Sequence, residues 1–204
     1  MYEPHWIVPE RGSAALLDGF LQYESLSRSG SRFELRLSRR ETAGRRGLSE
    51  DERGAIQMLL LGRSQKEIAF ELGVSVATVS TLIRVALRRL GIPCWQHVVL
   101  AAAFLERAAM NDHRPSIPGC EMSVEEAACV VHVELSSALL SLTDAERDVV
   151  LAAADGCSNE QIACGSNKSV RTVANQLASA FRKMGARGRV ELLRCIAQQM
   201  CAAP

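Results

Sequence analysis

Two stretches of the chain carry basic side chains and no acidic ones. Residues 163–190 contain six Lys or Arg residues, and residues 74–92 contain three. Arg can pair two hydrogen bonds with a guanine edge, and Asn or Gln can do so with adenine, while Lys and Thr suit phosphate oxygens. The chemistry that these side chains can do is therefore docking on an anionic polymer. The alternative is a solvated helix face, because basic helix ends also stabilise the helix dipole.

An internal repeat supplies the elements that would position these side chains. Residues 48–91 align without a gap on residues 142–185, and 14 of the 44 positions are identical. The identities fall on helix caps, turn glycines and apolar positions. This placement predicts two copies of one fold unit.

Each copy is predicted to form four helices. Capping boxes mark the starts of the first two helices at Ser49, Ser64, Thr143 and Ser158. Residues that tolerate positive φ stand where these helices should end, at Gly62, Gly73, Gly156 and Asn167. Ser75 and Ser169 are suited to cap a third helix that ends before Gly91 and Gly185.

The third helix has one apolar face in both copies. Its apolar residues are Val79, Ile83, Ala86, Leu87 and Leu90, and the second copy repeats the same spacing from Val173 to Met184. A short helix, a tight turn and a longer helix with a polar outer face form a helix-turn-helix. The second helix of that motif enters the major groove of DNA with its N-terminal half.

The two copies resemble the LuxR-type (GerE-type) helix-turn-helix family. The first copy carries the motif from Leu48 and Glu52-Arg53 through Glu67-Ile68-Ala69 and Thr78-Val79 to Leu90-Gly91-Ile92, and the second from Leu142-Thr143 and Glu146-Arg147 through Gln161-Ile162-Ala163 and Arg171-Thr172-Val173 to Lys183-Met184-Gly185. The resemblance implies four-helix domains of a transcription regulator that binds double-stranded DNA and dimerises through its last helix. The family's usual Lys and His after Thr-Val are replaced by Ser80 and Leu82, and by Ala174 and Gln176.

The resemblance and the outward positions together define the candidate DNA-binding residues. In the second copy they are Lys168, Ser169, Arg171, Thr172, Asn175, Gln176 and Arg182. In the first copy they are Ser75, Ala77, Thr78, Ser80, Thr81, Arg84 and Arg88. We expect a sequence-specific regulator, and the alternative is an adaptor whose helix-turn-helix units bind RNA polymerase or another regulator.

The fourth helices carry apolar stripes that their own small domains cover on one side only. These stripes predict a homodimer interface formed by Trp95, Val98, Val99, Ala102, Leu192, Leu193, Ile196 and Met200. The alternative is that the two stripes of one chain pack against each other. We favour the homodimer, because identical stripes are self-complementary without further adaptation.

The predicted fold is all-α, with two tandem four-helix domains. Residues 1–47 form an N-terminal extension with an Arg-rich end, residues 48–106 domain one, residues 107–141 a loop plus a connector helix, and residues 142–204 domain two. The connector helix is expected over residues 124–140, with a strand at Val131–Leu135 as the alternative. Within the extension we expect a short helix at Ala14–Tyr23 and a brief strand at Phe33, Leu35 and Leu37.

Other function classes are not expected. No stretch approaches the ~18 apolar residues of a membrane span, and the N-terminus does not resemble a signal peptide. The seven cysteines lack metal-ligand spacing with a histidine, and no catalytic triad or phosphate-binding glycine loop is present. We therefore expect no catalytic residues, no metal and no cofactor, no membrane association, and a cytoplasmic protein associated with the nucleoid.

Overall fold

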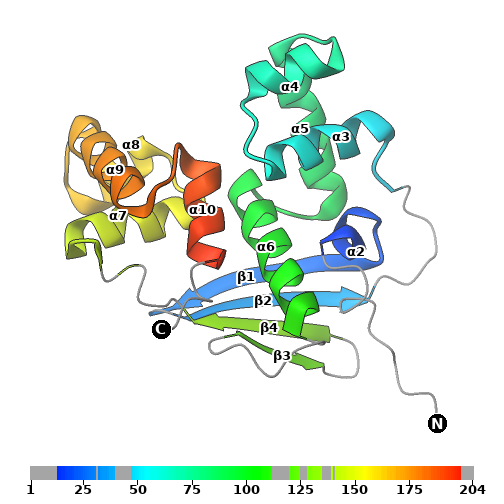
Figure 1. The fold of residues 1–204 in the computed structure, drawn as a ribbon, viewed down its shortest axis with the longest axis horizontal. Helices are drawn as coiled ribbons and strands as arrows, with labels where there is room; N and C mark the ends of the chain where they lie inside the picture. Colours follow the sequence, from blue (N-terminus) through cyan, green and yellow to red (C-terminus); the bar gives the residue numbers. More distant parts are fainter. Residues whose placement is uncertain are drawn as a thin grey trace.

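The computed structural model describes residues 13–30, 32–39, 47–111, 120–124, 128–134, 139 and 141–198. Its elements are α2 (Ala14–Leu17), β1 (Leu21–Ser29), β2 (Arg32–Arg39), α3 (Glu50–Leu60), α4 (Gln65–Leu72), α5 (Val76–Leu90), α6 (Trp95–Asn111), β3 (Cys120–Val124), β4 (Ala128–Glu134), α7 (Asp144–Ala154), α8 (Asn159–Ser166), α9 (Val170–Met184) and α10 (Arg189–Gln198). The chain is mostly helical, as predicted. Helices α3 to α6 form unit one and helices α7 to α10 form unit two (Figure 1).

The helices of both units begin and end where the sequence predicts. All four capping boxes are formed, and in each one the hydroxyl and the carboxyl or amide side chain satisfy backbone N–H groups reciprocally. The helix-ending residues have positive φ, including Asn167 at 53°, the one such non-glycine residue in the described part of the chain. The repeat therefore folds as two similar units because its caps and turns are written locally in the sequence.

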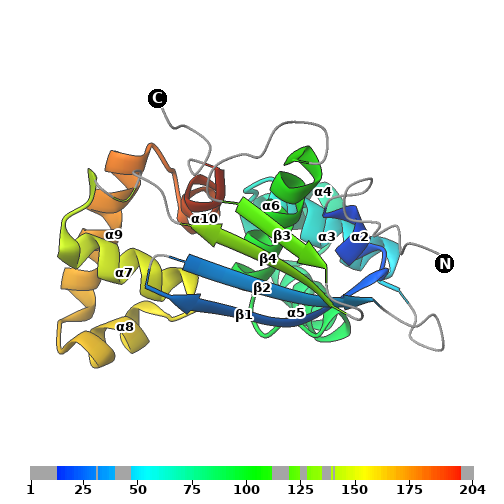
Figure 2. The same ribbon diagram turned by 90° about the horizontal axis from the view of Figure 1, so that it is seen from below.

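A four-stranded antiparallel sheet, in the order β1-β2-β4-β3, lies beneath unit one. Helices α2 and α6 lie on one of its faces (Figures 1 and 2). Phe33, Leu35 and Leu37 point into this core and are at most 1% exposed, and Phe33 meets Phe104 of α6 with ring centroids 5.9 Å apart. The strand expected at these three residues is confirmed, and the short helix at Ala14 is confirmed over α2 only.

The connector helix predicted over residues 124–140 is wrong. Residues 128–134 form β4, in which Leu35 pairs with Val131 and Leu37 with Cys129 of the central strands. The apolar spacing that suggested a helix belongs to a strand that is buried on both faces, since Val130 and Val131 are each at most 1% exposed. The β-branched valines favour strand over helix once a partner strand is available. The predicted loop is also shorter, because α6 continues to Asn111.

The two units meet through their fourth helices, because α6 packs directly against α10. In both units, the turn after the first helix lies against the start of the fourth helix of the other unit. The turn at Gly62 of unit one lies against Glu191 of α10, and the equivalent turn at Gly156 of unit two lies against Cys94, which directly precedes α6. Gln96 adds a hydrogen bond of 3.5 Å from its side-chain amide to the Gly156 carbonyl oxygen. The units are thus arranged about an approximate two-fold relation within one chain.

This packing changes the basis of the predicted homodimer. Val98, Val99, Ala102, Leu192, Leu193 and Ile196 are all at most 5% exposed within the single chain, Trp95 is half-buried, and Met200 lies outside the described residues. The apolar stripes that called for a partner are covered by each other and by the sheet. The structure contains the alternative arrangement, an intramolecular pair of α6 and α10.

The turns at Gly62 and Gly156 provide a matched test of the joint, by which we mean the contact between the two units at α6 and α10. Gly62 and Gly156 have φ of 85° and 93°, so alanine at either position should cost ~1–2 kcal/mol for the left-handed backbone. A Cβ at Gly62 would meet its nearest atom at 3.8 Å, whereas one at Gly156 would lie 2.8 Å from Cys94 Sγ. We expect Gly156→Ala to lower the unfolding free energy by more than Gly62→Ala in urea denaturation.

The larger loss of unfolding free energy in Gly156→Ala should depend on the sulfur atom of Cys94. In a double-mutant cycle, Cys94→Ala should remove most of the difference between the two glycine variants. Equal losses for Gly156→Ala and Gly62→Ala would contradict the contact between the units.

Candidate nucleic-acid interface

Each unit contains a short helix, a turn and a longer helix in the order of a helix-turn-helix. In unit one the axes of α4 and α5 differ by 100°, within the range of this motif. Gly73 makes the turn in unit one, and Asn167 makes it in unit two with φ of 53°. The longer helices α5 and α9 then begin at capping serines, Ser75 and Ser169.

The starts of α5 and α9 have the same polar arrangement. Ser75 Oγ accepts a hydrogen bond from Thr78 N at 3.0 Å and contacts Thr78 Oγ1 at 2.8 Å. Ser169 and Thr172 repeat both distances in unit two. The two hydroxyls at each helix start are exposed and anchored, which suits them to contact a phosphate beside the helix N-terminus.

The predicted DNA-binding residues lie on the outward faces of α5 and α9. Lys168 and Gln176 are half-buried, and the remaining candidates are exposed: Ser169, Arg171, Thr172, Asn175, Arg182, Ser75, Ala77, Thr78, Ser80, Thr81, Arg84 and Arg88. The apolar residues of the same helices are buried, including Val79, Ala86, Val173 and Ala180 at 0% exposure. The structure therefore presents every candidate side chain to solvent at least in part.

Some polar candidates have partners inside the protein. Lys168 Nζ donates to Gln176 Oε1 at 3.3 Å, which occupies the amide oxygen that a paired contact with adenine would need. In unit one, Ser80 Oγ donates to Gln65 Oε1 at 2.9 Å, and Thr81 Oγ1 donates to the Ala77 carbonyl oxygen at 3.1 Å. Unit one thus has fewer free polar groups for base contacts than unit two, where Arg171 and Asn175 are exposed.

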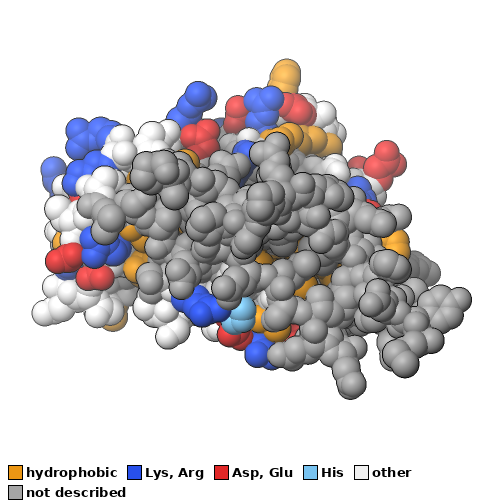
Figure 3. Space-filling model, turned by 60° about the horizontal axis from the view of Figure 1, so that its bottom comes forward, with side chains coloured by type: hydrophobic (Ala, Val, Ile, Leu, Met, Phe, Trp, Pro, Cys, Tyr) orange, Lys and Arg blue, Asp and Glu red, His pale blue; other side chains and the backbone are white. Residues whose placement is uncertain are grey.

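The charges on the two helices are of one sign. Neither α5 nor α9 contains an acidic residue. Within the described ranges, Arg84, Arg88, Arg171 and Arg182 have no ion-pair partner, whereas Arg89 and Lys183 each pair with a glutamate. Figure 3 shows Lys and Arg side chains gathered at the end of the molecule where unit two lies.

Two buried glutamates hold these helices in place, a role that the sequence analysis missed. Glu52 and Glu146 are 5% and 7% exposed, and each closes a capping box at the start of the first helix of its unit. Each also pairs with a basic residue in the last turn of the third helix, Arg89 at 3.0 Å and Lys183 at 2.7 Å. The signal was present, because both members of the pair recur in the repeat.

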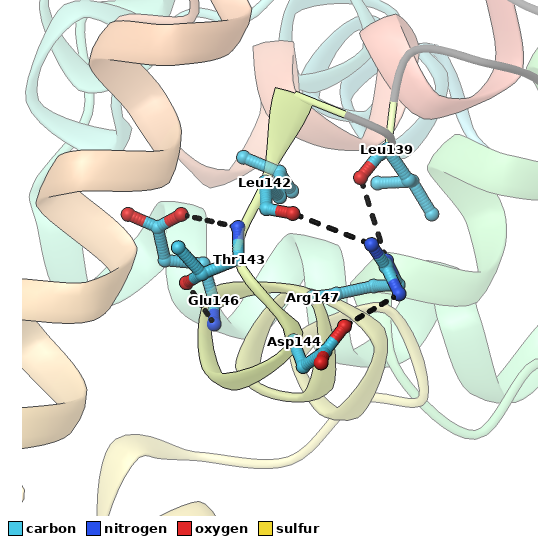
Figure 4. Close-up of polar contacts among 6 residues, drawn as sticks. All are labelled: Leu139, Leu142, Thr143, Asp144, Glu146 and Arg147. Atoms are coloured by element: carbon cyan, nitrogen blue, oxygen red, sulfur yellow. Dashed lines mark hydrogen bonds and ion pairs between the residues drawn. The ribbon is translucent and has the colours of Figure 1, made fainter.

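The arginine after each glutamate fixes the preceding segment. Arg147 donates to the carbonyl oxygens of Leu139 and Leu142, at 3.4 and 3.3 Å, and pairs with Asp144 at 3.0 Å (Figure 4). Arg53, at the equivalent position of unit one, pairs with Asp18 and donates to the Leu17 carbonyl oxygen. Unit one is thereby joined to the segment that leads into the sheet.

The Arg-rich end of the N-terminal extension begins within β2. Arg36 pairs with Glu34 at 2.7 Å within β2, while residues 40–46 of the Arg-rich segment lie outside the described residues.

In the described part of the chain, no group of three His, Cys, Asp or Glu side chains is placed to hold a metal ion. No single described helix is long and apolar enough to cross a membrane, and the one helix pair that passes by length and composition is the sharply bent α4–α5 pair.

Comparison with known families supports two helix-turn-helix domains of different types. Residues 140–196 match the model of bacterial regulatory proteins of the luxR family. Residues 46–90 match the model of sigma-70, region 4. The expectation that both copies are LuxR-type is therefore corrected for unit one. Both families are DNA-binding regulatory domains rather than enzymes. No curated protein and no solved structure matches the chain significantly.

The hydrogen bonds and the ion pair of Glu146, together called the Glu146 clamp, predict how the stability of the protein depends on pH. The hydrogen bonds from Lys183, Ser179 and Thr143 lower the pKa of Glu146 from 4.5 to about 2. Because the folded pKa lies below the usual value, the stabilisation is complete above pH 4.5 and is lost as the pH falls toward 2. We expect Glu146→Gln to lower the unfolding free energy at pH 6 and to flatten its decline between pH 4.5 and 2.

The control is Asp144→Asn, which removes a 93% exposed carboxylate from the same helical turn. This variant should keep the steep decline in acid, as measured by urea denaturation at a series of pH values. A Glu146→Gln protein with the unmutated pH profile would show that the clamp does not contribute.

Proposed function

We propose that the chain is a sequence-specific transcription regulator that binds double-stranded DNA through its two helix-turn-helix units as a built-in pair. The observation that carries this proposal is the acid-free outward face of α5 and α9. Four guanidinium groups on these faces, those of Arg84, Arg88, Arg171 and Arg182, have no ion-pair partner among the described residues. Cationic side chains without internal partners are available to neutralise phosphates.

The two units are proposed to play different parts. Arg171 and Asn175 lie in the N-terminal half of α9, the half that faces base edges in a helix-turn-helix complex, so unit two would supply most of the sequence reading. On α5, Ser80 and Thr81 have internal hydrogen-bond partners. Unit one would therefore grip phosphates, through Ser75, Thr78, Arg84 and Arg88, more than it reads bases.

The joint between α6 and α10 supports the paired mode. A pair of recognition helices usually comes from two identical subunits about a two-fold axis. Here the approximate two-fold relation lies within one chain, so one molecule would present both helices to one DNA site. The site would consist of two different half-sites, because the outward residues of the two units differ. The expected cytoplasmic, nucleoid-associated location belongs to this proposal.

A second candidate function is an adaptor that binds RNA polymerase or another regulator. It is favoured by four large apolar side chains of unit one that are exposed, Leu61 (69%), Phe70 (88%), Val74 (37%) and Val76 (42%). Figure 3 shows hydrophobic, acidic and basic side chains together over the region of α4. The match of this unit to sigma-70 region 4 is consistent with contact to the transcription machinery.

Salt dependence separates the two candidates. The purified protein would be used to select duplexes from a random library, and affinity for the selected duplex would be measured from 50 to 300 mM salt. If Arg84, Arg88, Lys168 and Arg182 each neutralise one phosphate, log K should fall with log salt with a slope of about −3.6. An adaptor would select no duplex and would show almost no affinity for generic DNA.

Substitutions on α9 test the reading role of unit two. Arg171→Ala should relax the sequence preference, because a paired contact with guanine contributes ~1–3 kcal/mol of discrimination. The matched control is Arg182→Ala, an exposed arginine about three turns further along the same helix. This control should weaken all duplexes similarly and make the salt slope shallower by about one. An unchanged specificity profile for Arg171→Ala would remove Arg171 from the reading set.

A further inference from the structure

Two cysteines lie at the joint between the units, one from each unit. Cys94 directly precedes α6 of unit one, and Cys157 lies in the turn between α7 and α8 of unit two. Both are half-buried free thiols. The joint therefore holds one thiol from each helix-turn-helix unit.

The backbone brings these thiols close together. Cys94 Sγ lies 2.8 Å from the position of a Cβ on Gly156, the residue next to Cys157. Consecutive Cα atoms are about 3.8 Å apart, which places Cys157 Cα within about 8 Å of Cys94 Sγ. Both cysteines are free thiols in this structure, so forming the bond requires their side chains to turn toward each other and the Cα–Cα separation to reach about 4.4–6.8 Å.

Hydrogen bonds hold the turn that carries Cys157. Gln96 donates to the Gly156 carbonyl oxygen at 3.5 Å, and Arg189 Nη1 donates to the Cys157 carbonyl oxygen at 2.9 Å. The Cys157 backbone N–H also donates to the Ala152 carbonyl oxygen at 3.1 Å. The turn that carries Cys157 is therefore held beside the start of α6, which Cys94 precedes.

We propose that Cys94 and Cys157 form a disulfide under oxidising conditions, and that this bond cross-links the two helix-turn-helix units. With hydrogen peroxide as the oxidant, the Cys157 thiolate attacks one peroxide oxygen, the O–O bond breaks, and sulfenic acid and water form. The Cys94 sulfur then attacks the Cys157 sulfur, the S–O bond breaks, and a second water leaves. Two thiols and one peroxide thus give one disulfide and two waters.

The order of the two steps follows from burial. Burial raises the pKa of the Cys94 thiol, which lowers its fraction of thiolate, the form that attacks peroxide. Cys94 is therefore assigned the second step. Of the other free thiols that the structure describes, Cys129 is 0% exposed in the core of the sheet and Cys164 lies on α8. Cys195 lies on α10, where its Sγ donates to the Met184 carbonyl oxygen at 3.8 Å.

The cross-link is tested by peptide mapping of the full chain. Cleavage after Lys and Arg places Cys94 in the peptide 90–107, and Cys157 together with Cys164 in the peptide 148–168. The experiment therefore uses a Cys164→Ser protein, so that any bond to the second peptide involves Cys157. After treatment with hydrogen peroxide and alkylation of free thiols, mass spectrometry should find the two peptides joined, with two hydrogens lost.

Two serine variants and a measurement of Tm serve as controls for the peptide mapping. The linked species should be absent in Cys94→Ser and in Cys157→Ser, and oxidation should raise the Tm of the Cys164→Ser protein but not of these two variants. Full alkylation of both cysteines after peroxide would overturn the proposal. So would a disulfide from Cys157 to a different cysteine, or between two chains on a non-reducing gel.

The effect on DNA rests on the proposed function. A cross-linked joint fixes the spacing of α5 and α9, so the oxidised protein should lose more affinity than the reduced protein when the two half-sites are moved apart by a few base pairs. Equal losses in both forms would show that the bond does not constrain the pair. Absence of DNA binding in both forms would reject the proposed function and leave the peptide-mapping result unaffected.

Discussion

The arrangement of this protein depends on the burial of α6 on more than one side. Residues 98–102, together with Phe104 and Leu105, are at most 5% exposed, and a helix that is apolar around most of its circumference must be covered all round. The sheet covers one side and α10 another, while α5 connects it to the rest of unit one. Because α10 belongs to unit two, the helix that completes unit one also fixes where unit two sits. The relation between α5 and α9 is a consequence of this core.

The parts of the fold that could be predicted from the sequence are those fixed within a few residues. Ser64 and Glu67, or Ser158 and Gln161, satisfy the start of a helix without help from elsewhere. The sheet depends instead on pairs such as Leu35 with Val131, which lie far apart along the chain. In the sequence alone, β4 has helical spacing as well as strand propensity. Only the partner strands β2 and β3 decide between them, which is why the helix predicted for the connector is wrong.

The candidate site could be predicted in position but not in detail. The spacing of the apolar face was enough to place Arg171 and Asn175 on the outside of α9, because a helix has one buried face and one solvent face. The spacing did not show that Lys168 binds Gln176, or that Ser80 binds Gln65. These contacts depend on side-chain directions across a turn. Unit one also has a sequence close enough to the LuxR pattern to be assigned to it, although the family comparison places it with sigma-70 region 4.

A covalent pair of units relaxes a constraint that a homodimer cannot escape. In a homodimer each substitution appears twice, so a change that spoils base contacts in one half-site spoils them in both. Here the two units are encoded separately, so each can change without the other. The buried glutamates and their basic partners, which hold each third helix, are kept in both units. The outward residues differ, with Ala77 and Thr81 in unit one at the positions of Arg171 and Asn175 in unit two. The joint has diverged in the same way, because Gly62 meets the flexible side chain of Glu191 while Gly156 meets a thiol. The divergence therefore falls on the surfaces that the framework of each unit does not need, which are the surfaces available for specialisation.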